Sequence, residues 1–125
     1  ASSGHDPFLF QIRDDGLPLR PASVDLVLCV RFLHRPLLKQ LARYLRPGGV
    51  LLYSHFVDGV QLVGTPKNPA GYLMHGELCE VAAAAGLEVT LHREVTLDDG
   101  RPIVEFLARR PAVASPAKDA TAGSE

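Results

Sequence analysis

VDLVLCVRFLHR, residues 24–35, is a nearly unbroken apolar run that ends in polar side chains. Over residues 24–30 apolar side chains fall on both faces of the pleat, with Asp25 as the exception. This pattern is typical of a strand inside a parallel sheet that helices cover on each side. Two alternatives follow for its end: the strand simply stops there as a buried strand, or it places polar groups such as Arg31 and His34 at a ligand site.

The composition limits the size and the partners of the chain. With 125 residues, 46% apolar residues and a net charge of −1, we expect at most one soluble domain with a modest core. Lys and Arg are scattered, so no nucleic-acid surface is evident. The apolar stretches fall short of the roughly 20 residues that span a bilayer, so no membrane association is predicted.

The cysteines and the beginning of the sequence bear on the compartment. Residues 1–7, ASSGHDP, carry neither the basic nor the apolar region of a secretory signal. Cys29 and Cys79 show no metal-ligand spacing and are expected to be free thiols, buried or half-buried, in a reducing compartment. The His residues are not paired at ligand spacing either, so no metal site is predicted. These features favour an intracellular, cytoplasmic location.

Periodicity predicts alternating strands and helices. We expect strands at 8–13, 24–30, 50–56, 87–95 and 102–109, and amphipathic helices at 36–46 and 75–86. Pro47, Gly48 and Gly49 are predicted to end the first helix, and Gly86 to cap the second. Residues 57–73 form a long irregular stretch, typical of a functional lid or a linker.

The carboxyl-terminal part has a different pattern. Strict alternation over 87–95 places Leu87, Val89 and Leu91 on one face of a half-exposed strand. The turn at Asp98, Asp99 and Gly100 predicts an antiparallel hairpin with the following strand. Together these elements indicate an α/β fold: a Rossmann-like three-layer sandwich whose mostly parallel sheet ends in an antiparallel hairpin, with ligands beyond the carboxyl ends of its strands.

Three segments are expected along the chain. Residues 1–7 are assigned to an N-terminal leader, residues 8–110 to the domain, and residues 111–125, rich in Ala, Pro, Ser and Gly, to a disordered tail.

Several short motifs of the sequence are similar to those of a known family. VDLVLCV, FLHRPLL and LARYLRPGGVLLY together resemble the second half of a class I S-adenosylmethionine-dependent methyltransferase. YSHF and PKNPAGYLMHGEL look most like the small tellurite-resistance-type branch of that family. The resemblance covers roughly residues 8–110. It implies methyl transfer from S-adenosylmethionine (SAM) to an acceptor that the sequence does not identify.

The resemblance also implies cofactor-binding residues. Asp14, with Asp15 beside it, stands where the family contacts the adenine amino group, although Asp-Asp-Gly is equally a common turn. Cys29, Val30 and Arg31 stand at the strand end that lines the methionine part of the cofactor, partly through backbone carbonyls.

Three residues are candidates on the substrate side. His34 matches the family's Leu-His turn, where it acts either as a base or as the residue that caps the next helix. His55 replaces the Glu of the family's Tyr-Glu-Thr-Phe phrase, which changes both charge and proton chemistry. Asn68 either hydrogen-bonds the substrate or fixes the loop, and Glu77 is read as a residue favoured by a helix N-terminus.

The N-terminal motifs of the family have no counterpart in the sequence. A strand followed by a glycine-rich G-x-G turn is absent, and so is the acid that holds the ribose hydroxyls; Gly48-Gly49 is predicted to end a helix instead. We therefore expect a carboxyl-terminal portion that lacks the first strands and is completed by an N-terminal part, by a complementing chain or in an oligomer. A catalytically inactive binding or assembly module is the first alternative. A fragment of another nucleotide-binding α/β protein is the second, disfavoured by the antiparallel hairpin.

Overall fold

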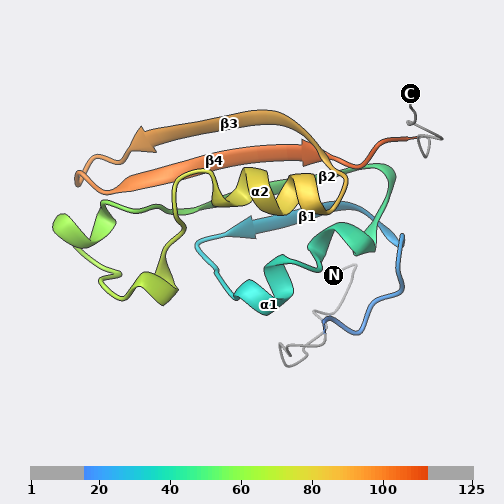
Figure 1. The fold of residues 1–125 in the computed structure, drawn as a ribbon, viewed down its shortest axis with the longest axis horizontal. Coiled ribbons are helices and arrows are strands. Elements are labelled where there is room, and N and C mark those ends of the chain that lie inside the picture. The colour runs from blue at the N-terminus through green and yellow to red at the C-terminus, as the bar shows by residue number, and fades with distance from the viewer. Residues whose placement is uncertain (1–15, 113–125) are drawn as a thin grey trace, which may run out of the picture.

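The computed structural model describes residues 16–112, which form a twisted sheet with its helices on one face (Figure 1). The strands are β1 (Val24–Val30), β2 (Leu45–Phe56), β3 (Glu88–Thr96) and β4 (Pro102–Arg109), and the α-helices are α1 (Arg35–Leu38) and α2 (Glu77–Ala84). Short 3-10 turns lie at Leu41–Tyr44, Val60–Leu62 and Pro69–Gly71. The predicted strand at 8–13, the leader, Asp14 and Asp15, and most of the predicted tail lie outside the described residues.

The sheet is mixed, and its strand order is β1-β2-β4-β3. β1 runs parallel to β2, whereas β4 is antiparallel to both β2 and β3. The predicted α/β fold and the antiparallel hairpin are therefore confirmed. The last strand lies between β2 and β3 and opposite to both in direction, which counts against the nucleotide-binding fragment that would end in a parallel strand.

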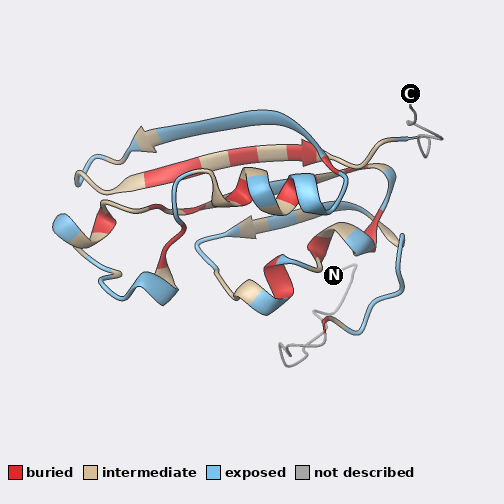
Figure 2. Ribbon diagram, viewed as in Figure 1, coloured by how far each residue is buried: buried red, intermediate tan, exposed pale blue. Residues whose placement is uncertain are grey.

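The core lies between the sheet and the two helices. Alternate residues of the two central strands turn toward the helices: Leu51 and Tyr53 from β2, and Val104, Phe106 and Ala108 from β4. They pack against buried residues of the helical layer, which are Leu37, Leu38, Leu41, Leu78 and Ala82. Figure 2 shows this as buried segments on β4 and on the inner sides of both helices. Burial of these side chains is the main term that stabilises the domain.

The helix predicted at 36–46 is shorter than expected. The α-helix ends at Leu38, a 3-10 turn follows, and Leu45 already belongs to β2. The carboxyl end of this segment belongs to the sheet instead: Leu45 pairs with Val24 of β1, and the Arg43 and Tyr44 carbonyls accept hydrogen bonds from the Ala22 and Ser23 amides, at 2.8 and 2.9 Å. The predicted apolar stripe is nevertheless buried at Leu37, Leu38, Leu41 and Leu45.

Gly48 and Gly49 lie within β2, so their predicted role as the end of a helix is wrong. Val24 pairs with Leu45 and Leu26 pairs with Val50, which leaves a bulge in β2 between these pairs. A Cβ on Gly49 would lie 3.2 Å from the Asp25 carbonyl oxygen of the neighbouring strand. Glycine is needed because the two backbones approach closely there.

β1 is an edge strand of the described sheet, and residues 16–112 cover only one of its two faces, whereas the sequence predicts cover on both. Val27 and Cys29 pack against the core, whereas Leu26, Leu28 and Val30 on the other face remain 54%, 61% and 52% exposed. Both helices lie on the core side (Figure 1). The sequence pattern is thus that of a strand buried on both faces, and within residues 16–112 the strand is buried on one face.

β3 does not alternate strictly. Val89 pairs with Ala108 and Leu91 pairs with Leu107, so a bulge between them turns Val89 and Leu91 to opposite faces. The prediction that these two residues share a face is therefore wrong, and β3 is exposed along most of its length (Figure 2). Two other predicted features are confirmed: Gly86 follows α2 with φ +77°, and Gly100 closes the hairpin turn with φ +89°.

Two further expectations concern thiols and membranes. Cys29 and Cys79 are free and partly buried, as predicted. Among residues 16–112, no helix is long and apolar enough to cross a membrane.

Candidate functional site

The site forms where the carboxyl ends of β1 and β2 meet the segment 57–73. Parallel strands end at the same edge of a sheet, so the residues after β1 and after β2 are neighbours. The segment 57–73 is fixed in place by the burial of Val57 and Val60. In addition, the Asp58 amide donates to the Leu73 carbonyl, and the Leu73 amide donates to the Phe56 carbonyl. The end of this segment leads into α2, and the first residue of α1, Arg35, contacts it (Figure 1).

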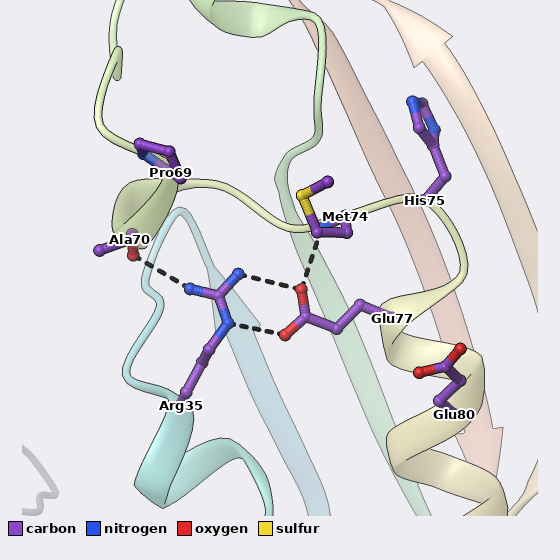
Figure 3. A pocket seen from close by; sticks show the side chains of 7 residues that line it. All are labelled: Arg35, Pro69, Ala70, Met74, His75, Glu77 and Glu80. Carbon is purple, nitrogen blue, oxygen red and sulfur yellow. Dashed lines mark hydrogen bonds and ion pairs between the residues drawn. The ribbon is translucent and has the colours of Figure 1, made fainter.

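Arg35 joins three segments at this edge (Figure 3). Its guanidinium donates to both carboxylate oxygens of Glu77, with Nε to Oε2 at 2.7 Å and Nη2 to Oε1 at 2.9 Å. It also donates to the carbonyl oxygens of Tyr72, at 2.7 Å, and Ala70, at 3.3 Å. Because the fork of the guanidinium matches a carboxylate and leaves donors for two carbonyls, Arg35 ties α1 to α2 and to the end of the segment 57–73.

Glu77 is held as a carboxylate. The hydrogen bonds from Arg35 are the largest cause that lowers its pKa, partial burial opposes them, and the Met74 amide, 2.9 Å from Oε1, adds to the lowering. Correspondingly, the hydrogen bond with Glu77 raises the pKa of Arg35. The pair therefore stays charged at neutral pH and acts as a fixed clamp.

A cavity of about 550 Å³ lies beside this clamp. Figure 3 shows Arg35 and Glu77 bonded in its middle, with Met74, His75 and Glu80 on the side of α2. Arg35 neutralises Glu77, and the other ionisable residues of the lining are His75 and Glu80. Among residues 16–112, no group of three or more His, Cys, Asp or Glu residues is placed to hold a metal ion.

Arg31 turns the chain at the end of β1. Its φ of +57° lies in the left-handed region, which is unusual for a residue with a side chain and ends the strand. The Arg31 amide donates to the Ser54 carbonyl at 2.8 Å, and its Nη1 lies 2.7 Å from the Ser54 hydroxyl oxygen. The guanidinium also lies over the Phe56 ring, 5.3 Å from its centroid. The tip of β1 is therefore tied to β2 and carries a positive charge.

The side chains of Cys29 and Val30 point in opposite directions. The Cys29 thiol turns toward the core side, where it and the Tyr53 hydroxyl both donate to the Phe32 carbonyl. Burial is the main cause that raises the pKa of both Cys29 and Tyr53, so both stay neutral at pH 7. Val30, by contrast, is 52% exposed, and Phe32 just beyond it is 41% exposed. An open apolar surface thus borders the strand end.

His34 begins α1 through its backbone. The Leu38 amide donates to the His34 carbonyl at 2.8 Å, and the His34 side chain makes no capping hydrogen bond. His34 thus occupies the N-cap position without capping the helix through its side chain, and its role as a base stays a prediction.

His55 is buried on β2, with 6% of its surface exposed. Its Nε2 lies 2.8 Å from the Gly71 carbonyl oxygen, which requires a proton on Nε2, and its Nδ1 is buried without a hydrogen-bond partner in the structure. Burial is the main cause that lowers its pKa, and the charges of Arg31 and Arg35 add to this. His55 therefore holds the segment 57–73 as a neutral imidazole.

The remaining polar candidates have local partners. The Asn68 Oδ1 accepts from the Ala70 amide at 2.9 Å and so caps the 3-10 turn Pro69–Gly71, which agrees with the loop-fixing alternative. His75 is exposed, but its Nδ1 lies 2.8 Å from the Glu94 carboxylate, which is the main cause that raises its pKa.

The predicted residues fall into separate groups. Cys29, Val30 and Arg31 form the tip of β1, and His55 and Asn68 both serve to fix the segment 57–73. Asp14 and Asp15 lie outside the described part of the chain. Sequence reasoning missed the Arg35–Glu77 pair because 42 residues separate its members and each has a simpler local explanation at a helix start.

Comparison with known proteins identifies the fold of the chain. No protein-family model matches the chain. The uncharacterized protein UNK4.09 of Schizosaccharomyces pombe is 33% identical over 89 residues, which are 69% of this chain and 26% of that protein. A SAM-dependent methyltransferase from Methanosarcina mazei superposes with a TM-score of 0.64 at 16% identity, over 81% of this chain and 66% of that one. The chain has the fold of class I SAM-dependent methyltransferases.

The methyltransferase fold does not by itself specify the reaction. The cyclase SpnF also superposes, with a TM-score of 0.61 at 15% identity over 82% of this chain and 55% of that one. The chain spans about a quarter of the curated relative and between about half and two thirds of these two solved structures. One fold carries several chemistries, so activity must be argued from the site.

Proposed function

We propose that this chain supplies the carboxyl-terminal part of a SAM-dependent methyltransferase of the tellurite-resistance-like type, acting on an acceptor of unidentified class. The observation that carries the proposal is the tip of β1: a strand end turned by Arg31, open on one side, at the carboxyl edge of a sheet with the methyltransferase fold. Ligands of open α/β sheets bind at this edge.

The residues at this tip fit one wall of a SAM pocket. Val30 and Phe32 offer apolar surface to the aliphatic part of methionine, and Arg31 offers a cation to its carboxylate. SAM, when bound, supplies an already activated methyl group, so the protein has to orient the reactants and exclude water. The other wall, including a glycine-rich turn for the rest of the cofactor, has no counterpart among residues 16–112, and we assign it to a complementing polypeptide part.

Arg35 and Glu77 support the acceptor side of the site in this proposal. Their clamp positions the segment 57–73 and α2 around the cavity without itself having to exchange protons. His55 positions the same segment through Gly71. The catalytically inactive module has support as well, because His55 and Asn68 are both engaged in internal hydrogen bonds.

Calorimetric titration with SAM tests the proposal and separates the two functions. The chain of residues 1–125 is compared with the same chain extended at its amino terminus by the upstream coding sequence. A methyltransferase part predicts micromolar binding by the extended chain and binding at least tenfold weaker by residues 1–125. Equal affinity would show that no complementing part is needed. No binding by either at millimolar SAM would favour the inactive module.

A further inference from the structure

The cavity beside the Arg35–Glu77 clamp is one end of a longer hollow in the helical layer. A second cavity, of about 270 Å³, lies between the end of α1 and α2 and shares Glu80 with the first. A third, of about 360 Å³, shares Lys39 and Ala85 with the second and is bordered by Arg110, just after β4. The shared residues show that the three cavities follow one another along α2. We call them the clamp cavity, the middle cavity and the basic cavity, and together the long groove.

The ionisable residues of the basic cavity are all cations. They are Lys39, Arg43 and Arg110, and no Asp or Glu of residues 16–112 lines this cavity. The two arginines are held in place, because Arg43 Nη2 donates to the Tyr44 hydroxyl at 3.3 Å and the Arg110 guanidinium donates to the Leu45 carbonyl. A recess lined by charge of one sign attracts ions of the opposite sign.

Elsewhere in the described part of the chain, many cations already have a carboxylate beside them. Five arginines form ion pairs, which are Arg35–Glu77, Arg46–Asp25, Arg93–Glu105, Arg101–Asp99 and Arg109–Glu88. The basic cavity is therefore a local concentration of positive charge and not part of a broad basic surface. A small recess of this kind suits a single phosphate or carboxylate group, whereas a nucleic-acid backbone needs an extended basic surface.

The middle cavity is mainly apolar. Val81, Ala84 and Ala85 form its wall on α2, with Lys39 toward the basic cavity and Glu80 toward the clamp cavity. The short alanine side chains leave room beside the helix that longer side chains would fill. This part of the groove suits an apolar segment of a ligand, while the Glu80 carboxylate disfavours an anion at the clamp end.

We propose that the long groove binds an elongated amphipathic acceptor, whose phosphate or carboxylate end lies in the basic cavity and whose apolar middle lies along α2. The end that receives the methyl group lies in the clamp cavity, at the carboxyl edge of β1 and β2. This assignment of an acceptor class rests on the proposed function. At the α-helical rise of about 1.5 Å per residue, Glu77 and Ala85 are roughly 12 Å apart, so the ligand has to be at least about that long.

The test uses amphiphiles of matched length as probes and contains no SAM. Decyl phosphate, decanoate, inorganic phosphate and decyltrimethylammonium are each titrated into isotope-labelled chain 1–125 below micelle-forming concentrations, and backbone amide shifts are followed by NMR. Decyl phosphate or decanoate should shift residues 39–43 and 80–85, and the tighter of the two identifies the anionic group. Inorganic phosphate should bind at least tenfold more weakly and shift only residues around the basic cavity. Decyltrimethylammonium, with the same chain and the opposite charge, should not bind there.

Two lysine variants decide the location. Lys39→Gln removes a charge that lines both the basic and the middle cavity, and it should weaken binding of the tighter amphiphile about tenfold. Lys67→Gln, at an exposed lysine of the segment 57–73 outside the lining of all three cavities, should leave binding unchanged. Equal binding by Lys39→Gln, or equal affinity for decyl phosphate and decyltrimethylammonium, would overturn the proposal.

Two further outcomes bear on the length and the role of the ligand. Inorganic phosphate binding as tightly as decyl phosphate would show a simple anion site and overturn the elongated ligand. Binding of the amphiphile to the groove together with no SAM binding by the extended chain would overturn the role as methyl acceptor while the groove itself stands. Failure of the amphiphile titration, in turn, leaves the calorimetric result with SAM as an independent finding.

Discussion

Arg35 and Glu77 connect more segments of the fold than their local sequence predicts. Their side chains are 32% and 19% exposed, so solvent screens the pair less than it screens the surface ion pairs. Glu77 also accepts from the Met74 amide, so loss of its charge weakens contacts to two segments at once.

Replacing Glu77 should destabilise the domain measurably. Glu77→Gln keeps the shape but leaves the Arg35 guanidinium without its charge partner, and we expect a loss of about 1–3 kcal/mol in the free energy of unfolding. The matched control is Glu105→Gln at the Arg93 pair, whose side chains are 61% and 36% exposed and where we expect about 0–1 kcal/mol. Urea unfolding followed by circular dichroism measures both; equal losses in the two variants would contradict the role of the clamp.

The pKa of His55 predicts how stability depends on pH. Burial lowers this pKa, so the unfolded chain takes up a proton at a higher pH than the folded chain does. The contribution of His55 is complete above its unfolded pKa, about 6.5, and is lost as the pH falls below that value. His75 acts in the opposite sense: its raised pKa gives a contribution that is complete below its unfolded pKa and is lost as the pH rises through the folded one.

Comparison of variants separates the two histidines. Between about pH 7.5 and 5.5, the wild-type chain should lose stability relative to His55→Gln and gain stability relative to His75→Gln, measured by urea unfolding at each pH. Glu77 does not contribute in this window, because its pKa lies below its ordinary value of 4.5. Identical pH profiles for the wild type and His55→Gln would show that His55 is not held neutral by burial.

At the scale of elements, the sequence predicts the type of each strand and helix better than its extent. Period and turn residues identify β1, α2, β3 and β4 because these depend on local patterns. The end of the segment after Pro36 is set by β1 and the residues before it: Leu45 pairs with Val24, and the carbonyls just before Leu45 accept hydrogen bonds from Ala22 and Ser23. The bulges at Gly49 and between Val89 and Leu91 likewise depend on neighbouring strands, so local periodicity carries no sign of them.

The bulge of β2 offers a test at this scale. A Cβ at residue 49 would lie 2.9 Å from the Arg46 carbonyl oxygen and 3.2 Å from that of Asp25, and backbone atoms cannot give way cheaply. Gly49→Ala should therefore cost about 1–3 kcal/mol in thermal or urea unfolding. Gly64→Ala is the control, because a Cβ there would meet only side-chain carbons of Arg101, the nearest at 3.2 Å, and no backbone atom. If Gly49→Ala leaves the free energy of unfolding unchanged, the backbones of β1 and β2 do not approach each other as closely as the structure shows.

For the whole molecule, the sequence pattern and the structure differ most in the burial of β1. The sequence of residues 24–30 is that of an interior strand, yet within residues 16–112 the strand is an edge with Leu26, Leu28 and Val30 exposed. The fold and its antiparallel end could be predicted from periodicity and motifs. The site could be predicted only in part, because the Arg35–Glu77 clamp and the hydrogen bonds that engage His55 and Asn68 arise from contacts between distant segments.

The central claim is that the tip of β1 is one wall of a SAM pocket completed by another polypeptide part. Hydrogen–deuterium exchange on the chain extended at its amino terminus, with and without SAM, tests it most directly. We predict that SAM slows exchange at residues 29–32 of the extended chain, leaves the β3–β4 turn unchanged, and at the same concentration protects residues 29–32 of the chain 1–125 much less. SAM binding to the extended chain without protection at residues 29–32, or the same protection in residues 1–125 alone, would contradict the account.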